Sequence, residues 1–397
     1  MKKNYSLYGL PEVKFCKLCV MSNQKPNAVV ELSNKDNLKK GMDINDDGIC
    51  NACQYSKIKE NINWDEREEY LKKILSQYRK SSGFDCIVPS SGGKDSSYAA
   101  HVLKYKYNMN PLTVTWAPHL YTDIGWKNFI NHIHIGGVDN ILFTPNGKLH
   151  RYLTKIAFLN LLHPFQPFIV GQKNIGPKIA AKFNIPLVIY GENTAEYGKS
   201  IDENYDPLMP AKYFKNPKKN IYIGKKTINE IVKETKFNLK DFEAYMPIEE
   251  SEIVKKNIKV FHLGYFHKWD PQEMYYYASE NTGFKANTER TEGTYSKYAS
   301  IDDKVDCFHY YTMHIKFGVG RASFDAAQEI RNGKITREEG INLVKKYDGE
   351  FPKKYFKEFL DYIDIDENLF WKSIDSFRSP HLWEKKTDKW QLKKELI

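Results

Sequence analysis

The sequence lacks any apolar run long enough to span a membrane, which takes about 20 residues. The best candidate, residues 156–170, is interrupted by Asn160, His163 and two prolines. The first residues, Met1-Lys2-Lys3, are not followed by the apolar core of a secretory signal. We therefore expect a cytoplasmic protein, in which the six cysteines would not form disulfides.

Arginine is scarce, since only 8 of the 60 basic residues are arginine. The formal charge of +10 is modest for 397 residues, and dispersed lysines indicate a solvated surface. An acidic partner, either nucleic acid or a negatively charged small substrate, is the alternative. A hydrophobic content of 41% with 14% aromatic residues is typical of a globular chain, and this length suits two or three domains.

The two commonest phosphate-binding motifs, Gly-x-x-x-x-Gly-Lys-Ser/Thr and Gly-x-Gly-x-x-Gly, are absent. Residues 90–97, Ser-Ser-Gly-Gly-Lys-Asp-Ser-Ser, instead follow an apolar run at 84–89 and precede a helical pattern. This order predicts a strand, a turn and a helix, with backbone N–H groups presented to a phosphate. The phosphate ligands would be Ser91, Gly92, Gly93, Asp95 and Ser96, assisted by Lys94 and Ser97. Asp95 would repel a phosphate unless it caps the helix or acts through a metal ion.

Four of the cysteines form two Cys-x-x-Cys pairs, Cys16 with Cys19 and Cys50 with Cys53. Two such pairs can place four thiolates tetrahedrally around one Zn²⁺ at about 2.3 Å. An iron–sulfur cluster and unligated structural cysteines are the alternatives. Cys86, inside an apolar run, is expected in the core, and Cys307 carries only a weak expectation of nucleophilic chemistry because no helper base is identifiable.

The fold class predicted is α/β, with a parallel sheet covered by helices on both faces, because strand and helix patterns alternate from residue 84. The strands are predicted at 84–89, 111–117, 140–144 and 186–190. The helices are predicted at 65–80, at 124–135, and at 147–183 in two pieces separated by prolines.

Three domains are expected: a zinc module at 1–62, the α/β domain at 63–245, and a mostly helical domain at 246–397. The polar, lysine-rich stretch 200–245 is expected as a mobile insertion over the site. Ligands of parallel sheets bind beyond the carboxyl ends of the strands. The loop 90–97 should therefore converge with two further strand ends, Thr115-Trp116 near the adenosine and Gly191-Glu192.

The loop resembles the pyrophosphate loop of the N-type (PP-loop) ATP pyrophosphatases, which cleave ATP to AMP and pyrophosphate. Nearly the whole chain resembles one branch of them, the N-acetyl sugar amidotransferases of surface-polysaccharide, O-antigen, pseudaminic-acid and flagellin-glycan pathways. Besides the loop and the cysteine pairs, the resemblance rests on the segments 171–177, 190–193, 268–272, 292–295 and 317–322.

The resemblance implies a reaction and its participants. ATP, with Mg²⁺, would adenylate the oxygen of an acetamido group on a nucleotide-activated sugar, and ammonia would displace AMP to leave an acetamidino group. No glutaminase signature is evident, so the ammonia would come from a separate glutaminase with a cyclase-like channel subunit. No membrane or nucleic-acid partner is expected.

The resemblance also nominates further site residues. Glu192 would contact a metal or the ribose, with an ordinary surface acid as the alternative, and Gln172 and Lys173 would face the reacting centre. The sugar nucleotide would be bound by Lys268, Trp269, Asp270, Arg290, Glu292, Tyr295 and Arg321. Each of these is also explained by an internal ion pair or a packing aromatic. His309 and His314 are expected to pack among the tyrosines.

Two other functions compete with this one. A tRNA-thiolating or lysidine-type enzyme of the same superfamily would suit the basic charge and the cysteine pairs, although no nucleic-acid-binding module is evident. A non-catalytic zinc-ribbon scaffold would suit the cysteines alone, although the intact loop argues against it.

Overall fold

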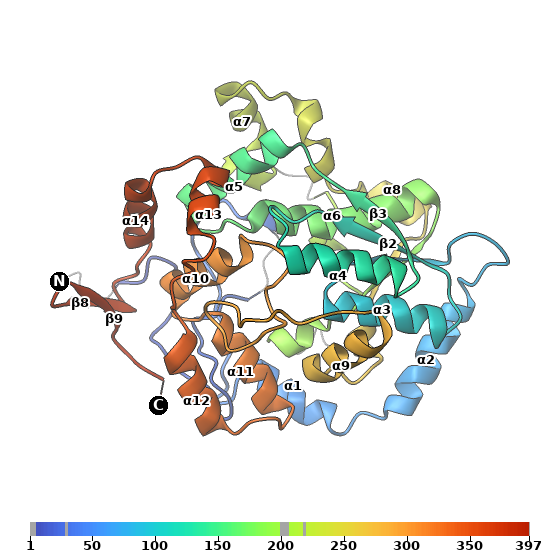
Figure 1. Cartoon of the computed structure of the whole chain (residues 1–397), viewed down its shortest axis with the longest axis horizontal. Coiled ribbons are helices and arrows are strands. Elements are labelled where there is room, and N and C mark those ends of the chain that lie inside the picture. The colour runs from blue at the N-terminus through green and yellow to red at the C-terminus, as the bar shows by residue number, and fades with distance from the viewer. Residues whose placement is uncertain (1–4, 28–30, 199–205, 217–219, 397) are drawn as a thin grey trace.

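The computed structural model describes residues 5–27, 31–198, 206–216 and 220–396 (Figure 1). Its centre is a five-stranded parallel sheet in the order β3-β2-β1-β4-β7. The strands are β1 (Cys86–Pro89), β2 (Pro111–Trp116), β3 (Asp139–Phe143), β4 (Leu187–Tyr190) and β7 (Lys259–His262). The chain builds outward from β1 to β3 and then returns to the other side of β1. This reversal places a topological switch point between β1 and β4.

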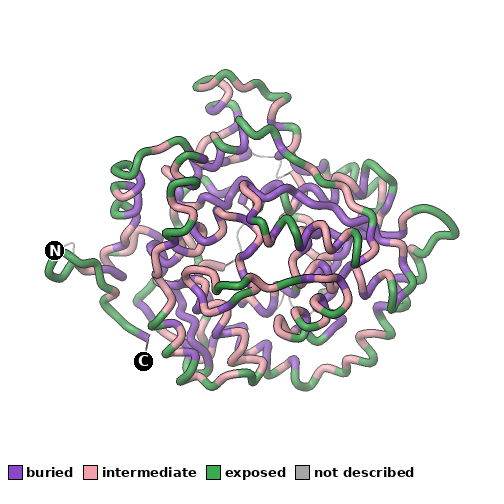
Figure 2. The backbone as a smooth tube through the Cα atoms, in the orientation of Figure 1, coloured by how far each residue is buried: buried purple, intermediate pink, exposed green. Residues whose placement is uncertain are grey.

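Alternate residues of the strands separate the interior into two cores. Ile87 and Val188 pack into one core, and Val88 and Ile189 pack into the other. The helices α2 (Trp64–Ser76) and α3 (Lys94–Tyr105) cover the Val88 face, whereas α6 (Gln166–Phe183) covers the Ile87 face. Figure 2 shows the buried backbone gathered in the interior and the exposed backbone along the rim. The predicted α/β class is confirmed.

The predicted helices are found with small shifts of their ends. Residues 65–80 form α2, 124–135 form α4 (Asp123–His134), and 147–183 form α5 (Gly147–Leu161) and α6. The break between α5 and α6 falls at Leu162, whose φ of 46° is left-handed, and Pro167 stands in the first turn of α6. Proline is tolerated in a first helical turn because that N–H has no intrahelical partner.

Strand β7 lies within residues 246–397, where the sequence predicted a mostly helical domain separate from the sheet. It pairs in register with β4, for example Val188 with Val260, so the sheet continues past the expected domain boundary at residue 245. The stretch 200–245 includes η4 (Ala211–Tyr213), the hairpin β5 (Tyr222–Ile223) and β6 (Lys226–Thr227), α7 (Ile228–Glu234) and η5 (Leu239–Tyr245). Phe242 and Tyr245 are fully buried, so this part is anchored in the core. Residues 199–205 and 217–219 of the stretch lie outside the described residues.

The C-terminal part is mostly helical, as predicted. Its elements are α8 (Glu250–Lys255), η6 (Leu263–Tyr265), α9 (Pro271–Asn281), α10 (Asp306–Phe317), α11 (Arg321–Arg331), α12 (Arg337–Tyr347), α13 (Phe356–Ile363), α14 (Glu367–Ser376) and the hairpin β8 (Trp383–Lys386) with β9 (Lys389–Leu392). The N-terminal residues, with η1 (Glu31–Ser33), pack against these helices: the Tyr8 hydroxyl donates to the Phe377 carbonyl at 2.5 Å. Among the described residues, no helix is long and apolar enough to cross a membrane.

A buried ion pair joins the N-terminal part to the sheet and to α11. Lys59, the last residue of α1 (Asn51–Lys59), donates to Glu196 at 2.8 Å, and both side chains are at most 3% exposed. The same ammonium donates to the Trp269 carbonyl and to Asn332. Glu196 belongs to η2 (Thr194–Tyr197), which directly follows the end of β4. The pair therefore ties three segments that are distant in sequence.

The Glu196→Gln variant should lose about 3 kcal/mol of unfolding free energy, because it leaves the buried Lys59 ammonium without a counter-charge. Glu69→Gln is the matched control, since the Glu69–Lys72 pair is exposed and such pairs contribute about 0–1 kcal/mol. Urea unfolding of the purified variants measures both. Equal, small effects of the two substitutions on the unfolding free energy would contradict a stabilising role of the Lys59–Glu196 pair.

Candidate active site

The loop after β1 has the geometry of a phosphate cradle. Gly92 has a φ of 82°, and a Cβ there would lie 2.6 Å from the Phe129 Cα. Only glycine fits at this position without a backbone shift. Gly93 is the N-cap of α3, so the N-terminal end of that helix points out of the loop. A helix N-terminus carries partial positive charge and favours an anion.

The serines of the loop are held by neighbouring side chains. The Ser90 hydroxyl lies 3.0 Å from both Ser96 Oγ and His132 Nε2. Burial lowers the pKa of His132 to about 4, so the ring is neutral at physiological pH. Ser91 Oγ donates to Asp302 at 3.1 Å. Ser97 is fully buried beneath the loop.

Lys94 and Asp95 form an ion pair at the first turn of α3, with Nζ 2.7 Å from both carboxylate oxygens. Asp95 therefore neutralises Lys94 in this state instead of capping the helix. The Lys94 ammonium also lies 6.0 Å from the centroid of the Tyr298 ring. Both charged groups are half-buried, and they are available to a ligand that separates them.

The two further strand ends converge on the loop, as predicted. Thr115 is buried beneath it and donates to the Ser90 carbonyl at 2.5 Å, while Trp116 forms part of a cavity wall. A Cβ at Gly171 of α6 would lie 2.1 Å from the Trp116 ring. Glycine at 171 therefore lets α6 pack closely against this tryptophan.

Gly191, at the end of β4, touches the backbone of the loop helix, because a Cβ there would lie 2.7 Å from the Asp95 carbonyl oxygen. The next residue, Glu192, projects into the space beside Asp95. Loss of hydration beside the surrounding protein atoms and the nearby Asp95 raise the pKa of Glu192, while Lys94, Lys173 and Arg321 act in the opposite direction. The residue nevertheless stays exposed at the mouth of the site. A raised pKa makes the protonated form of this glutamate more accessible than that of an ordinary surface glutamate.

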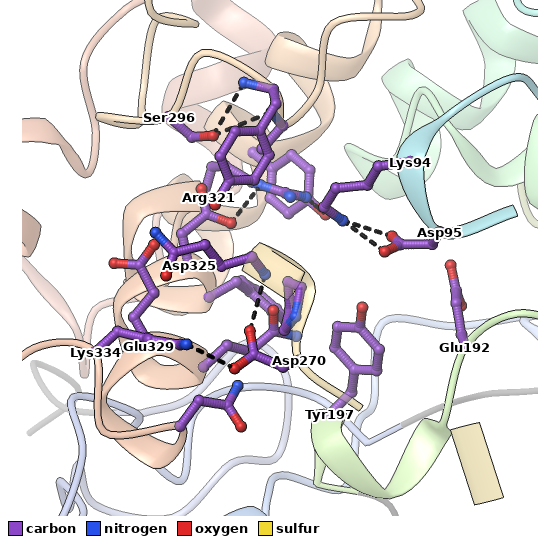
Figure 3. Close-up of a pocket in the computed structure, with 18 residues that line it drawn as sticks. Lys94, Asp95, Glu192, Tyr197, Asp270, Ser296, Arg321, Asp325, Glu329 and Lys334 are labelled. Carbon is purple, nitrogen blue, oxygen red and sulfur yellow. Dashed lines mark hydrogen bonds and ion pairs between the residues drawn. The ribbon is translucent and has the colours of Figure 1, made fainter. Parts of the chain in front are cut away.

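Two adjoining cavities meet at these residues. The first, which we name the loop cavity, has a volume of about 430 Å³ and lies over residues 89–96. The second, which we name the acidic cavity, has a volume of about 310 Å³ (Figure 3). Both are lined by Lys94, Asp95, Glu192, Tyr298, Ala299, Tyr310 and Arg321.

The acidic cavity lies between the loop and α11. Figure 3 shows Lys94, Asp95 and Glu192 along one wall and Asp325, Glu329 and Lys334 along the opposite one. Among these residues, carboxylates outnumber cations. Such a lining suits neutral groups rich in hydroxyl donors, and it disfavours a polyanion.

Arg321 stands between the two cavities. Its Nε lies 3.1 Å from an Asp325 carboxylate oxygen, and its Nη1 donates to the Tyr310 hydroxyl at 2.6 Å. The guanidinium is thereby fixed in place by side chains from α10 and α11. A fixed guanidinium can bind an anionic oxygen without losing further side-chain freedom.

The predicted site residues separate into two groups. Gln172 and Lys173 line the loop cavity, and Asp270 and Arg321 line the acidic cavity. Asp270 also caps α9 and pairs with Lys334 at 3.3 Å. The remaining predicted sugar ligands, described next, lie outside both cavities.

Trp269 is a core residue, only 1% exposed, and Lys268 is exposed beside a different surface cavity. Arg290 forms a bidentate pair with Glu350 at 2.6 and 2.7 Å. This agrees with the alternative that the sequence analysis left open, an internal ion pair. Glu292 accepts the backbone N–H of Lys354 at 3.1 Å. Tyr295 donates to Glu329 at 2.8 Å and so contacts the acidic cavity only through that carboxylate.

Two carboxylates that the sequence analysis did not nominate, Asp302 and Asp306, line the loop cavity. Burial raises the pKa of each to about 6, and the neighbouring acids add to this effect. Asp303, between them in sequence, uses Oδ2 for the backbone N–H and Nδ1 of His119, each at 2.7 Å, and its Oδ1 accepts the Val305 N–H at 2.9 Å. Their sequence, Ile-Asp-Asp-Lys-Val-Asp, has no distinctive spacing, and only the fold brings it opposite the loop.

The acidic cavity contains further residues that the sequence analysis missed. They are Tyr197, Ser296, Tyr298, Asp325, Gln328, Glu329, Asn332 and Lys334. The spacing of Asp325, Gln328, Glu329 and Asn332 at three and four residues places them on one face of α11 and its C-cap. This spacing is the signal that could have identified them.

The four paired cysteines form one buried cluster that could hold a metal ion, since their ligand atoms all lie within 4.8 Å of one another. The Sγ atoms of Cys16 and Cys53, and those of Cys19 and Cys50, are 3.8 Å apart. A tetrahedral ion with bonds of about 2.3 Å requires sulfur–sulfur separations of about 3.8 Å. The geometry therefore fits a single Zn²⁺, whereas the iron atoms of a cluster would hold the sulfurs farther apart.

Backbone groups support this cluster. The N–H groups of Leu18 and Cys50 point at Cys16 Sγ at 3.4 Å. The surrounding apolar residues come from α11 and α12, among them Ala326, Ala327 and Val344. The other two cysteines are core residues: Cys86 is fully buried in β1, and Cys307 packs in the main core with its pKa raised by burial.

Replacing Cys53 by Ser should remove the bound metal and lower the unfolding temperature, because the cluster would lose one of four ligands. Elemental analysis of the wild-type chain should give about one zinc per chain and no iron. Cys86→Ser is the matched control, since it should keep the metal while perturbing the core. Retention of full zinc content by Cys53→Ser would contradict the assignment.

The unfolding free energy of Asp302→Asn should rise relative to that of the wild type by about 1 to 2 kcal/mol between pH 4 and pH 7. The buried carboxyl binds its proton more tightly when folded, so its stabilising contribution is complete below about pH 4. That contribution is lost as pH rises through the folded pKa of about 6. Denaturant unfolding at several pH values measures the difference, with Asp139→Asn, an exposed aspartate, as the control. A stability difference between variant and wild type that is constant from pH 4 to 8 would contradict the raised pKa of Asp302.

Comparisons with known proteins add three findings. Residues 292–396 match a family model described as LPS biosynthesis protein WbpG-like, C-terminal domain. The uncharacterized protein MJ1599 of Methanocaldococcus jannaschii is 37% identical over 67 residues, which are 17% of this chain and 24% of that protein. The chain thus matches about a quarter of the length of that curated relative.

The structure of NMN synthetase from Francisella tularensis aligns with a TM-score of 0.27 and 16% identity, over 34% of this chain and 58% of that chain.

The family match covers α11, which carries Arg321, Asp325 and Glu329 into the acidic cavity. It confirms the predicted link to surface-polysaccharide biosynthesis. Residues 292–396 are therefore similar to the C-terminal domain of the WbpG-like LPS biosynthesis proteins.

Proposed function

We propose that the chain is an ATP-dependent amidotransferase of surface-glycan biosynthesis. It adenylates an acetamido group of a nucleotide-activated sugar and then uses ammonia to form an acetamidino group. One observation carries the proposal: a phosphate-cradling loop opens into two cavities that share Lys94, Glu192 and Arg321. A nucleotide in one cavity and an acceptor in the other would meet at those residues.

ATP occupies the loop cavity in this proposal. Its phosphates lie against Ser91, Gly93 and the start of α3, where backbone N–H groups and Lys94 favour negative charge. The opposite end of the cavity is apolar, and Trp116, Phe165 and Phe168 line it. An adenine ring is held there by stacking and apolar contact.

Magnesium would be held by carboxylates of the loop cavity. Asp302 and Asp306 fit this role, because burial has raised their pKa to about 6 and a cation would stabilise their charged forms. Asp95 is a third candidate once a phosphate has drawn Lys94 away from it. When bound, the ion neutralises charge on the leaving pyrophosphate.

The acceptor enters from the acidic cavity. Its hydroxyl groups donate to Asp270, Asp325 and Glu329, and the Tyr298 ring offers an apolar face to the sugar. The acetamido oxygen attacks the α-phosphorus at the junction of the two cavities, and the bond to the bridging oxygen of pyrophosphate breaks. Lys94 and Arg321 stabilise the charge that develops on the phosphate oxygens.

Ammonia then adds to the activated carbon, and the carbon–oxygen bond breaks so that AMP departs with the former acetamido oxygen. Glu192 accepts the proton that the attacking nitrogen loses, a role that its raised pKa supports. Gln172 and Lys173, on the loop-cavity side, position the intermediate. We further propose that a separate glutaminase with a cyclase-like channel subunit supplies the ammonia.

The tRNA-modifying alternative receives less support from these cavities. A tRNA strand would bring phosphates next to Asp270, Asp325 and Glu329, and like charges repel strongly at a partly buried site. The charge of the acidic cavity favours a neutral, hydroxyl-rich acceptor end.

The decisive experiment incubates the chain with ATP, Mg²⁺, ammonium chloride and candidate CMP- or UDP-linked diacetamido sugars. We expect AMP and pyrophosphate to appear together with a product in which NH has replaced one oxygen, detected by mass spectrometry. Formation of AMP without such a product would contradict the amidotransferase assignment. Glutamine used as readily as ammonium by the chain alone would contradict the partner proposal.

Asp95→Asn should lower the turnover rate about 100-fold, because the change disturbs both the Lys94 pair and a candidate metal ligand. Lys148→Ala is the control, since Lys148 is exposed on α5 away from the cavities. The two variants should have similar unfolding temperatures, which separates a catalytic effect from misfolding. Full activity of Asp95→Asn would place the metal elsewhere.

A further inference from the structure

A third cavity lies beside the loop cavity and carries an excess of positive charge. Its volume is about 190 Å³, and it shares Ile169, Lys173 and His309 with the loop cavity. Its other charged lining residues are Glu31, Lys39, His163 and Lys316. We name it the lysine cavity.

Lys316 is the most unusual group of this cavity. Its side chain comes from α10 and is only 7% exposed. Its ammonium donates to the Leu161 carbonyl at 2.9 Å, which uses one of its three N–H groups. Leu161 is the last residue of α5, so helix capping explains this single bond. It does not explain why Lys39 and Lys173 converge on the same cavity.

Among the described residues, the anionic groups near Lys316 do not balance Lys316 and Lys39. Of the described residues that line the cavity, Glu31 is the sole carboxylate, and it lies 3.5 Å from His163. Lys39 donates to Asn34 at 2.7 Å, and the acids that act on it are Glu31 and the neighbouring Asp36. Burial and the neighbouring Lys39 lower the pKa of Lys316 to about 7. The groups that act on Lys316 are Glu31, Lys39, Lys225, His163 and His309.

We propose that the lysine cavity is a binding site for a small oxyanion, a phosphate or carboxylate group, next to the site of adenylation. An anion between Lys39, Lys173 and Lys316 would compensate the buried ammonium charge. The volume is below the ~300 Å³ at which sites for whole small molecules begin, so it suits one acidic group.

The anion has two sources that share this chemistry. Pyrophosphate released from ATP can move along Lys173 from the loop cavity, and an acidic group of the acceptor can reach in from the same side. The choice between these sources, and the occupation of the loop cavity by ATP, rest on the proposed function.

The experiment measures binding to the full chain by calorimetry, with a non-hydrolysable ATP analogue saturating the loop cavity. The probes are pyrophosphate, orthophosphate and glucuronate, a sugar carboxylate. We expect at least one of them to bind, and Lys316→Met to weaken that binding at least tenfold. Preferred binding of pyrophosphate identifies the product as the source, and preferred binding of glucuronate identifies the acceptor.

Two controls separate an anion site from helix capping. Lys35→Ala, exposed on the same segment as Lys39, should leave binding unchanged. At pH 8 the wild-type chain should take up a proton on binding, seen as a dependence of the heat on the buffer, because the anion raises the pKa of Lys316. Lys316→Met should lose this uptake. A second variant, Lys39→Ala, repeats the binding test should Lys316→Met fail to fold.

The absence of binding by all three probes would overturn the proposal, as would equal binding by the wild type and a folded lysine variant. Oxyanion binding without any amidotransfer would leave this site established and contradict the proposed function alone. Amidotransfer without oxyanion binding would support the proposed function and overturn the oxyanion site.

Discussion

The contact between the end of β4 and the first turn of α3 is the constraint on which the site depends. Gly191 lies so close to the Asp95 carbonyl that a Cβ would stand 2.7 Å from it. This approach brings the end of β4 against the first turn of α3 and holds Glu192 next to the Lys94–Asp95 pair. The parallel sheet makes the contact possible, because β1 and β4 are neighbours whose carboxyl ends face the same way. Any larger residue at 191 would separate Glu192 from the Lys94–Asp95 pair.

A second set of contacts fixes the wall on which Glu192 stands. Cys50 of the four-cysteine cluster caps the start of α1, and Lys59 is the last residue of that helix. Lys59 pairs with Glu196, which lies four residues after Glu192. Arg331, at the end of α11, donates to the Glu196 carbonyl at 2.7 Å. Helix α11, which lines the acidic cavity, and helix α1, which starts at the cysteine cluster, therefore hold the same short segment. The cysteines lie outside both cavities but stabilise the geometry of their shared wall.

The sequence predicted correctly those features whose residues are contiguous or regularly spaced along the chain. The loop 90–97 is contiguous, the cysteine pairs have fixed spacing, and β1, β2 and β4 are short apolar runs between polar turns. Strand β7 was missed because its pairing with β4 is set by tertiary contacts and its sequence, Lys-Val-Phe-His, is short and mixed. Arg290 was nominated because arginine is scarce here, yet its guanidinium is already used by Glu350. The acidic cavity gathers side chains from β4, α9, the turn before α10, and α11, and no single segment displays that set.

The distribution of charge around the loop explains how one site could bind substrates of opposite character. The loop cavity combines Lys94, Lys173 and Arg321 with carboxyls whose pKa values burial has raised, so it is closest to electrical balance when Mg²⁺ and a nucleotide are bound together. The acidic cavity repels phosphates and accepts hydroxyl donors. An acceptor that carries both a neutral sugar and an anionic part is consequently oriented by repulsion as well as by contact. In the proposed reaction its acetamido group would lie at the junction where the two cavities share Lys94, Glu192 and Arg321.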